Sequence, residues 1–235
     1  MENSAFELCE DMQFRCLRIG TENEPLLLID SFIKGADELK NYAIEKNNFL
    51  KSDSYYPGLR MQIPATYTIA LAKNLSPFIN GFFGLDLEAI KKAVSRFSIV
   101  TTPAEDLDLL QRIPHIDSPS KDALAVVHYL KDAPDSGTSL YRHRATGFEY
   151  VDGSRYDVYM NHIKNYYADP VHTPTGYMRG SNNEYEEIMS VEAKFNRLIM
   201  YRGTSLHSGI IRPEYNFDPN PQTGRLTITS FYEFA

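Results

Sequence analysis

The distribution of apolar and polar residues along the chain changes near residue 93. Before that point, three segments place apolar residues at helical spacing, and one short apolar run predicts a strand. These are residues 36–47, 68–83 and 87–92 for the helices and residues 25–29 for the strand. We therefore expect residues 1–92 to form a helical and strand region that supports the rest of the chain.

From residue 93 onward, short runs of β-forming residues alternate with polar turns. Six runs predict strands, namely residues 95–101, 110–116, 123–130, 138–142, 195–201 and 226–234. Short strands that follow a few helices are typical of a sandwich or barrel with helices packed on one face. The chain is therefore predicted to be α+β, but mainly β.

A tyrosine-rich segment interrupts the predicted strands. Residues 152–169 have helical spacing, and residues 170–183 after them predict a loop. An excursion of this kind is often a lid or a substrate-binding element, and ordinary packing outside the sheet is an equally good interpretation. For the tyrosines of this segment we favour packing over a substrate wall: Tyr156, Tyr159, Tyr166 and Tyr167.

The composition is that of a globular protein, with 43% apolar and 23% charged residues in a chain of 235. A chain of this length can bury a core without disulfides, and two cysteines, Cys9 and Cys16, do not make a disulfide framework. The formal net charge of −7 argues against a broad phosphate-binding surface. We therefore expect no nucleic-acid partner.

The start of the chain is unlike a targeting or membrane segment. Residues 1–15 carry several acidic side chains and no long apolar run, unlike a secretory signal. The apolar run at residues 25–29 is far too short to span a bilayer. These features predict a cytoplasmic protein without a membrane partner.

Two histidines and one carboxylate suggest a metal site. His115 and Asp117 lie two residues apart on a predicted strand, so their side chains point to the same face, although such a pair alone is more often only hydrogen-bonded. His207, after the apolar run at residues 198–201, supplies a second imidazole. Two histidines and one carboxylate form the facial triad of non-haem iron(II) oxygenases, which leaves coordination positions open. A structural zinc site would have four protein ligands.

An arginine on a polar strand face is the second unusual feature. Alternation along residues 225–231 places Arg225, Thr227, Thr229 and Phe231 on one face of a strand. A buried guanidinium is costly unless it meets an anion, and its forked donors suit a carboxylate. We therefore expect Arg225 to face an anionic ligand.

In their order, these pieces and the segment 126–141 resemble the prolyl 4-hydroxylase-like branch of the iron(II)/2-oxoglutarate-dependent oxygenases. The resemblance covers residues 93–234. It rests on a His-x-Asp pair, a Tyr-Leu strand end, a following glycine, a distal histidine and a basic residue: His115 and Asp117, Tyr129-Leu130-Lys131, Gly137-Thr138, His207 and Arg225.

The resemblance implies a double-stranded β-helix, the jelly-roll or cupin-like fold, with helices packed on one face. Its core is expected over residues 93–235, with an insertion at about residues 144–190. The support region, residues 1–92, and this core are expected to form one oxygenase domain over residues 1–235.

The resemblance also implies a ligand set and an activity. Iron(II) is expected on His115, Asp117 and His207, with 2-oxoglutarate and O2 as cosubstrates. The residues expected to bind 2-oxoglutarate are Arg225, Tyr129 and Thr227. The implied reaction hydroxylates a small molecule, an amino acid or a peptidyl residue and releases succinate and CO2. The carboxylate of the triad is absent in halogenating relatives, so its presence favours hydroxylation over halogenation.

Some features depart from the family pattern. Arg225 lies 18 positions after His207, more than is usual in this branch, and residues 213–224 are expected to form an extra loop that absorbs the difference. Lys131 replaces an asparagine and Thr138 a glycine. These two replacements affect the shape of the substrate entrance rather than the metal site.

Other functions fit parts of the pattern. A cupin-like barrel that binds or senses a metal without oxygenase activity is the main alternative, but it has no need for an inward guanidinium such as that of Arg225. An interaction scaffold with structural histidines predicts no stoichiometric metal. A nucleic-acid demethylase is disfavoured by the acidic charge and by the lack of a dense basic run.

The remaining histidines and a group of arginines have ordinary interpretations. His128 alternates with Tyr129, so it should face away from the metal site, toward the surface or a helix. His143 lies in a charged strand end and is expected to be solvated, whereas His162 and His172 are expected to be structural. Three arginines are expected to form a solvated face rather than to steer an anionic substrate: Arg142, Arg144 and Arg155.

Overall fold

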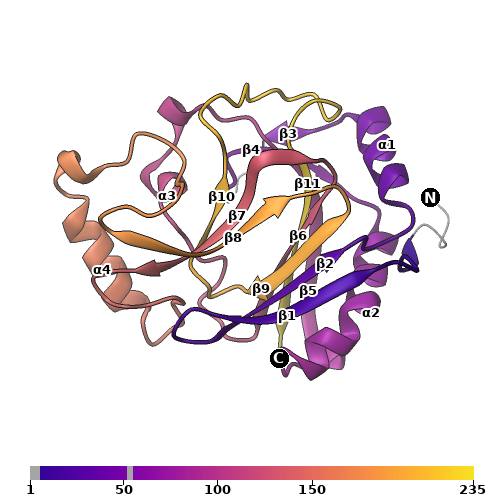
Figure 1. The fold of residues 1–235 in the computed structure, drawn as a ribbon, viewed down its shortest axis with the longest axis horizontal. Helices are drawn as coiled ribbons and strands as arrows, with labels where there is room; N and C mark the ends of the chain where they lie inside the picture. The colour runs from indigo at the N-terminus through magenta and orange to yellow at the C-terminus, as the bar shows by residue number, and fades with distance from the viewer. Residues whose placement is uncertain (1–5, 52–54) are drawn as a thin grey trace.

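The computed structural model describes residues 6–51 and 55–235, and two antiparallel sheets form its centre (Figure 1). Residues 1–5, part of the segment expected not to be a secretory signal, lie outside the described residues. The larger sheet has the strand order β1-β2-β9-β6-β11-β5-β4-β3, and the smaller has the order β10-β7-β8.

The strands of the larger sheet are, in chain order, β1 (Gln13–Ile19), β2 (Glu24–Asp30), β3 (Leu50–Lys51), β4 (Gly58–Gln62), β5 (Ile90–Val100), β6 (Ala123–Tyr129), β9 (Arg197–Arg202) and β11 (Leu226–Phe234). Those of the smaller sheet are β7 (Ala133–His143), β8 (Tyr185–Ala193) and β10 (His207–Ile210). The larger sheet therefore draws strands from both the support region and the predicted core.

Alternation decides which face of the larger sheet each side chain joins. β11 pairs with β6 so that Thr227 is level with Tyr129 and Ile228 is level with His128. Directly opposed residues point to the same face of a sheet. Tyr129 packs toward the smaller sheet, whereas Ile228 belongs to the core beneath the helices. The polar face predicted for β11 is thus the face turned toward the smaller sheet.

Two helices, α1 (Ala36–Lys46) and α2 (Ala65–Gly81), cover the other face of the larger sheet. α2 buries a stripe of side chains at helical spacing: Tyr67, Leu71, Leu75 and Ile79. Burial of an aliphatic side chain of this size contributes about 1.5–3 kcal/mol. The helices and the sheet therefore stabilise each other.

The smaller sheet lies against the face of the larger sheet opposite to the helices. Leu140 of β7 and Val191 of β8 pack against Val127 and Ile199 of the larger sheet. Two facing antiparallel sheets of this kind leave room for a cavity between them at the end that their side chains do not fill.

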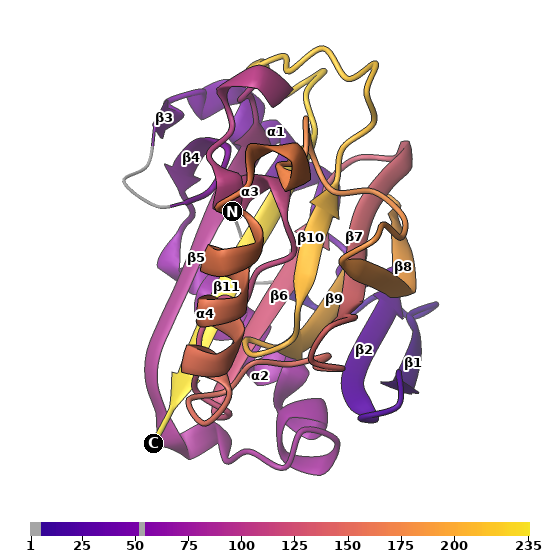
Figure 2. The same cartoon turned by 90° about the vertical axis from the view of Figure 1, so that its left-hand side faces the viewer.

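The expected insertion contains α4 (Tyr156–Tyr166) and the short 3-10 helix η4 (Pro170–His172). α4 lies at the opposite end of the molecule from α1 and α2 in Figure 1 and faces the viewer in Figure 2. Tyr159 and Ile163 of α4 pack against Tyr141 and Tyr185 of the smaller sheet. The insertion is therefore anchored to the smaller sheet.

Residues 110–116 do not form the predicted strand. The short helix α3 (Leu109–Arg112), which follows the 3-10 helix η3 (Ala104–Asp106), occupies the start of this segment. Asp108 and Gln111 form a reciprocal capping box that starts α3. This local capping outweighed the β-type pattern, and the prediction of a strand was wrong.

Other differences concern short or charged elements. The helix predicted for residues 87–92 is a 3-10 helix, η2 (Leu87–Ala89), after which β5 begins. β1, β3, β4, β8 and β10 were not predicted. β8 lies at the edge of the smaller sheet and contains three glutamates, which are common on edge strands. It was missed because these glutamates interrupt the apolar alternation that predicts a strand.

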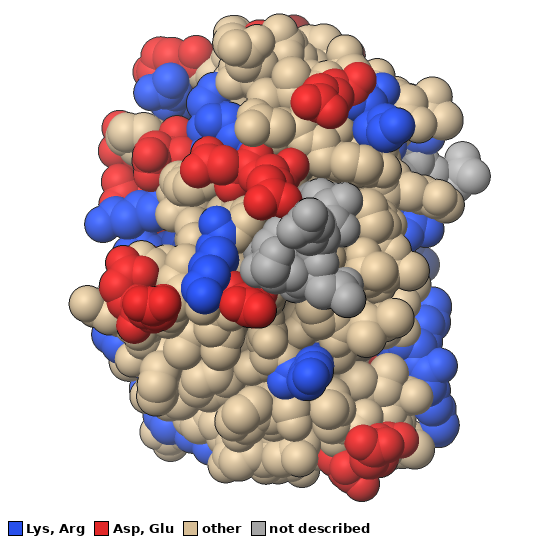
Figure 3. Space-filling model, turned by 90° about the vertical axis from the view of Figure 1, so that its right-hand side faces the viewer, with Lys and Arg blue, Asp and Glu red and all other residues tan. Residues whose placement is uncertain are grey.

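Acidic and basic side chains are interspersed on the side of the molecule that carries α1 and α2 (Figure 3). Within residues 6–51 and 55–235, no helix combines the length and the apolar character needed to cross a bilayer.

Candidate metal centre

Two reciprocal backbone hydrogen bonds bring the predicted histidine ligands together. The N–H of His115 donates to the carbonyl of His207, and the N–H of His207 donates to the carbonyl of His115, both at 2.9 Å. The centroids of the two rings lie 4.4 Å apart. Because the two residues oppose each other in an antiparallel bridge, both imidazoles enter the same cavity.

Asp117 completes the set of three ligands. Its backbone N–H donates to the carbonyl of Gly203 at 2.8 Å, which fixes the chain beside the turn after β9. Its Oδ2 lies 3.4 Å from Nε2 of His207. One ligand atom from each of His115, Asp117 and His207 lies within 4.8 Å of the other two. The predicted convergence therefore occurs, although His115 lies in an isolated bridge and Asp117 in a bend, both outside the named strands.

The hydrogen bond of the His207 ring sets its tautomer. Nδ1 of His207 lies 2.9 Å from the carbonyl oxygen of Ser205, which can only accept. Nδ1 therefore carries the proton, and Nε2, which faces Asp117, is free to bind a metal.

Partial removal from bulk water inside the cavity, to which His115 and Asp117 are open, favours the neutral imidazoles that metal binding requires. It lowers the pKa of His115 to about 4, with a further contribution from the neighbouring His207. It also lowers the pKa of His207 to about 4 and raises the pKa of Asp117 to about 6. These shifts apply to the protein without an ion, and a dication among the three side chains favours the ionised carboxylate.

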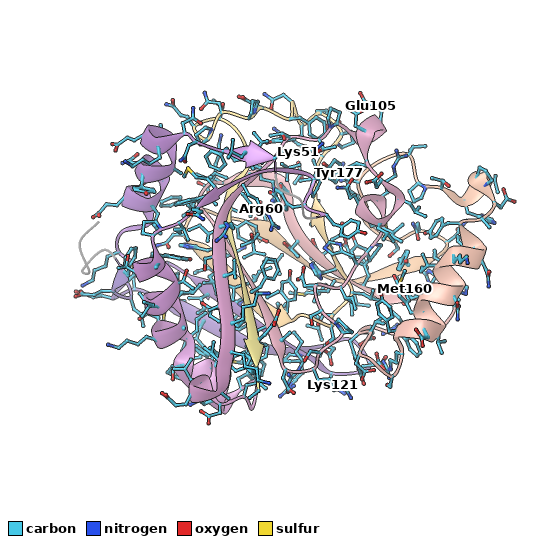
Figure 4. The ribbon with its side chains drawn as sticks, turned by 180° about the vertical axis from the view of Figure 1, so that it is seen from behind. Lys51, Arg60, Glu105, Lys121, Met160 and Tyr177 are labelled. Carbon is cyan, nitrogen blue, oxygen red and sulfur yellow. The ribbon has the colours of Figure 1, made fainter. Side chains whose placement is uncertain are left out.

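The three side chains line a cavity of about 690 Å³ between the two sheets and α4. A cavity of this size accommodates a small organic molecule. Aromatic side chains contribute much of its wall: Tyr56, Tyr156, Tyr159, Tyr177, Tyr201 and Phe231. Three lining residues are labelled in Figure 4, where Tyr177 lies between Arg60 and Met160 across the view.

Arg225 reaches the same cavity, as expected, and neutral groups hold it in place. Its Nε donates to Oγ of Ser136 at 2.8 Å, and its Nη2 donates to the carbonyl of Gly137 at 2.7 Å. The residue is only 7% exposed, and no carboxylate among the described residues forms an ion pair with it. The positive charge of Arg225 is therefore oriented but not neutralised, which is the electrostatic setting of an anion site.

Tyr129 and Thr227, the other two expected cosubstrate residues, lie close to Arg225 but differ in access. Tyr129 is fully buried, and its hydroxyl bonds to Oγ1 of Thr138 at 2.7 Å. Thr138 and Thr227 line the cavity, and Oγ1 of Thr227 donates a long bond of 3.4 Å to the Ser98 carbonyl. Tyr129 thus reaches the cavity through Thr138 rather than directly.

Residues 213–224 form the loop expected between the distal histidine and Arg225. The hydroxyl of Tyr215, in this loop, accepts the backbone N–H of Arg225 at 2.8 Å. Nζ of Lys131 donates to the carbonyls of Gln222 and Thr223. Lys131, which replaces the asparagine of the family pattern, therefore holds the extra loop at residues 213–224 in place.

Arg60 was not predicted as a site residue. It lies on β4, level with Ser98, which is in turn level with Thr227, so Arg60 faces the cavity. Its guanidinium lies 4.6 Å from the ring of Tyr56 and 5.9 Å from that of Phe231, and its buried Nε has no hydrogen-bond partner among the described residues. The sequence carried no signal for Arg60, because β4 has only five residues and no apolar alternation.

The other histidines separate into two environments. His128 is fully buried toward the helices, where it bonds to the hydroxyl of Tyr67 at 3.0 Å and to Oδ1 of Asn196 at 3.1 Å. Of its two expected places, the helix side is correct. The expectation that His143 is solvated was wrong, because it is fully buried and its Nε2 lies 2.6 Å from Oε1 of Glu184. The buried carboxylate of Glu184 therefore provides His143 with a partner inside the protein, although its charged sequence neighbours suggested contact with solvent.

Of the three arginines expected to form a solvated face, Arg144 is exposed, whereas the other two are paired with carboxylates. Arg142 bonds to Glu149 and Glu186, and Nη2 of Arg155 lies 2.7 Å from Oε1 of Glu22. Nε of Arg144 donates to a backbone carbonyl. The tyrosines of the insertion mostly pack, as favoured, since Tyr159 and Tyr167 belong to a buried cluster, although Tyr156 and Tyr159 also line the cavity.

The chain belongs to a family of unknown function (DUF6445), whose pattern matches residues 10–232. No curated protein matches the chain in sequence.

Several solved structures are similar to the chain at low sequence identity. EvdO2 from Micromonospora carbonacea var. aurantiaca, complexed with 2-oxoglutarate, has a TM-score of 0.50 and 10% identity, covering 93% of this chain and 94% of EvdO2. HygX from Streptomyces hygroscopicus, with nickel, 2-oxoglutarate and hygromycin B bound, has a TM-score of 0.49 and 16% identity, covering 91% and 84%. A Pseudomonas putida prolyl-4-hydroxylase has a TM-score of 0.45 and 12% identity, covering 95% and 92%. The likeness to EvdO2 confirms the predicted fold, a double-stranded β-helix.

Proposed function

We propose that this protein is an iron(II)- and 2-oxoglutarate-dependent oxygenase that hydroxylates a small molecule, an amino acid or a peptidyl residue. The observation that carries this proposal is the shared cavity of the His115–Asp117–His207 cluster and the unpaired guanidinium of Arg225. One supplies ligands for a metal with open positions, and the other supplies a cation for the far end of a dicarboxylate.

The donor set fits iron(II). Two neutral imidazoles and one carboxylate on one side of a centre match the facial arrangement of non-haem iron, and the cavity lies on the remaining side. When bound, iron(II), 2-oxoglutarate and dioxygen together supply the oxidising power, with release of succinate and CO2. The share of the protein is to position these groups and to exclude water.

Arg225 is proposed to bind the distal carboxylate of 2-oxoglutarate. Ser136 and Gly137 already hold its Nε and Nη2, so little side-chain freedom is lost when an anion binds. Thr227 and Thr138 present hydroxyl groups in the same cavity, and Tyr129 orients the hydroxyl of Thr138.

Arg60 is proposed to meet an acidic group of the substrate. It is a second cation on the cavity wall, on β4, which β5 separates from β11 and β6. Its guanidinium lies near two aromatic rings. A guanidinium that stacks on aromatic faces, and that forms no ion pair within residues 6–51 and 55–235, is suited to a planar anion such as a carboxylate.

Anaerobic addition of iron(II) and 2-oxoglutarate tests the proposal. The wild-type protein should develop the weak visible metal-to-ligand charge-transfer band of the chelate. Arg225→Gln should need about 10- to 100-fold more 2-oxoglutarate for the same band, because a charge-assisted pair is lost. Its iron(II) affinity should stay unchanged.

Two results would contradict the proposal. The first is no band at saturating iron(II) and 2-oxoglutarate in folded protein. The second is an unchanged 2-oxoglutarate requirement in Arg225→Gln. Stoichiometric iron without any effect of 2-oxoglutarate would support the cupin-like metal-binding module instead.

A further inference from the structure

A second cluster of two histidines and one carboxylate lies outside the candidate metal centre. It consists of His143 on β7, His162 on α4 and Glu184, immediately before β8. One ligand atom from each residue lies within 4.8 Å of the other two. Nε2 of His143 and Nε2 of His162 both lie 2.6 Å from the same atom, Oε1 of Glu184.

We propose that His143, His162 and Glu184 form a zinc site that fixes the insertion helix α4 to the smaller sheet. The proposed zinc site would exist whether or not the protein is an oxygenase.

The carboxylate of Glu184 is buried, and its side-chain partners are two histidines rather than a lysine or an arginine. Its side chain is 7% exposed, and within the described part of the chain no lysine or arginine pairs with it. The rings of Tyr159 and Tyr185 pack around His143, and their centroids lie 5.1 and 5.4 Å from that of the His143 ring. A buried carboxylate is stable when it is paired or bound to a metal, and a dication among the two imidazoles and Glu184 would balance the charge of the carboxylate.

The rings are oriented as metal ligands usually are. Nδ1 of His143 bonds to Oγ1 of Thr146 at 2.7 Å, which fixes the ring and turns Nε2 toward Glu184. A hydrogen bond on the far ring nitrogen is the usual support of a metal-binding histidine. The ring of His162 stands edge-on to that of His143, with centroids 4.6 Å apart, and stacks on Tyr166.

The ligand set and its access favour zinc. Imidazole and carboxylate are common zinc ligands, and a tetrahedral ion with three protein ligands accepts water as the fourth. The His162 side chain is 31% exposed, so an ion and a water molecule can reach the site from solvent. Ligand atoms around a tetrahedral zinc ion are about 3.3 Å apart. Rotation of the Glu184 and His162 side chains supplies the small opening from 2.6 Å.

The position of the site gives the ion a structural role. α4 carries Tyr156, Tyr159 and Met160, which line the active-site cavity. The hydroxyl of Tyr159 also donates to the carbonyl of Pro114 at 3.2 Å, one residue before His115. An ion that fixes α4 therefore fixes one wall of the cavity and supports the loop that carries the first metal ligand.

Zinc stoichiometry and location test the proposal. Chelator-treated full-length protein is titrated with ZnCl2, and bound zinc is counted by mass spectrometry of the metal after gel filtration. His162→Gln replaces a partly exposed ligand and should bind one equivalent less than wild type. The matched control His172→Gln, at an exposed histidine outside both clusters, should bind as much as wild type.

A second variant and a second readout separate the two sites. His207→Ala removes a ligand of the first centre, so the zinc that it retains must lie elsewhere. That retained zinc should raise its melting temperature, and crystals soaked in ZnCl2 should show anomalous density among His143, His162 and Glu184.

Equal zinc binding by wild type and His162→Gln would overturn the proposal, as would anomalous density at the first centre alone. If His162→Gln does not fold, the zinc content and anomalous map of His207→Ala decide the question without it. Absence of zinc from folded His207→Ala would be equally decisive against the site.

Discussion

Two clusters in this molecule contain the same side chains, two histidines and one carboxylate, but differ in what lies beside them. In the first, His115 and Asp117 are open to a cavity of about 690 Å³ that also contains an unpaired arginine. In the second, His143 and Glu184 are buried and the donors already contact one another. The difference teaches that the ligand set alone does not define a catalytic site. Open coordination positions and a neighbouring anion site do.

Removal of a ligand from the first cluster should have the largest effect. His207→Ala leaves one imidazole and one carboxylate, and we expect iron(II) affinity to fall by more than about 100-fold, since even outer-shell changes cost 10- to 100-fold. Consumption of 2-oxoglutarate should be lost in parallel. Isothermal titration with iron(II) under anaerobic conditions measures the affinity, and His172→Ala serves as the control. Retained iron(II) affinity in His207→Ala would mean that the two clusters have been assigned the wrong way round.

We expect the two arginines of the cavity, Arg60 and Arg225, to bind different molecules. Arg60→Gln should leave the 2-oxoglutarate requirement within about 3-fold of wild type, whereas KM for an acidic substrate should rise about 10- to 100-fold through loss of a charge-assisted pair. Uncoupled 2-oxoglutarate turnover and substrate kinetics measure the two effects. A large rise in the 2-oxoglutarate requirement of Arg60→Gln would place the cosubstrate near β4 instead.

A third buried histidine, His128, has no carboxylate partner and serves as the reference for both clusters. Burial lowers its pKa to about 4, so between pH 4 and about 6.5 the unfolded chain binds more protons than the folded one. The stability that the neutral, buried His128 contributes to the folded protein is fully present above pH 6.5 and is lost as the pH falls toward 4. Between pH 7 and pH 4.5, the free energy of unfolding measured with urea should fall in both proteins. The fall should be smaller in His128→Asn than in wild type by roughly 2–3 kcal/mol. Equal losses in the two proteins would contradict this assignment.

The link between the two clusters should have the smallest effect. Tyr159→Phe removes the hydroxyl that contacts Tyr185 at 2.9 Å and Pro114 at 3.2 Å. We expect the free energy of unfolding to fall by about 1 kcal/mol and turnover to fall by a few fold, with iron(II) affinity nearly unchanged. Tyr67→Phe, at a buried tyrosine on the helix side, is the matched control, and it should lose stability but not turnover. If both variants lose turnover alike, α4 has no special connection with the first centre.

The first cluster was more predictable from the sequence than its surroundings. Alternation placed Arg225 and Thr227 on one face, and the order of motifs joined His115 to His207 across the chain. Arg60 was missed because β4 has no apolar alternation to reveal it.

The second cluster was missed for a different reason. His143 stands between two arginines in the sequence, which suggested solvent. Partners distant in sequence, such as Glu186 for Arg142, satisfy those charges in the fold. Sequence neighbours report the local charge of a segment, whereas burial is decided by contacts that the local pattern does not contain.

The reciprocal backbone hydrogen bonds between His115 and His207 have a consequence for metal loading. Because the main chain brings the two residues together, an ion that binds at the proposed site can do so after folding with little rearrangement. Sites of imidazole and carboxylate bind several later first-row divalent ions more tightly than iron(II), so availability as well as affinity decides which ion such a site holds. The ion found in freshly purified material will therefore reflect what the growth medium offered.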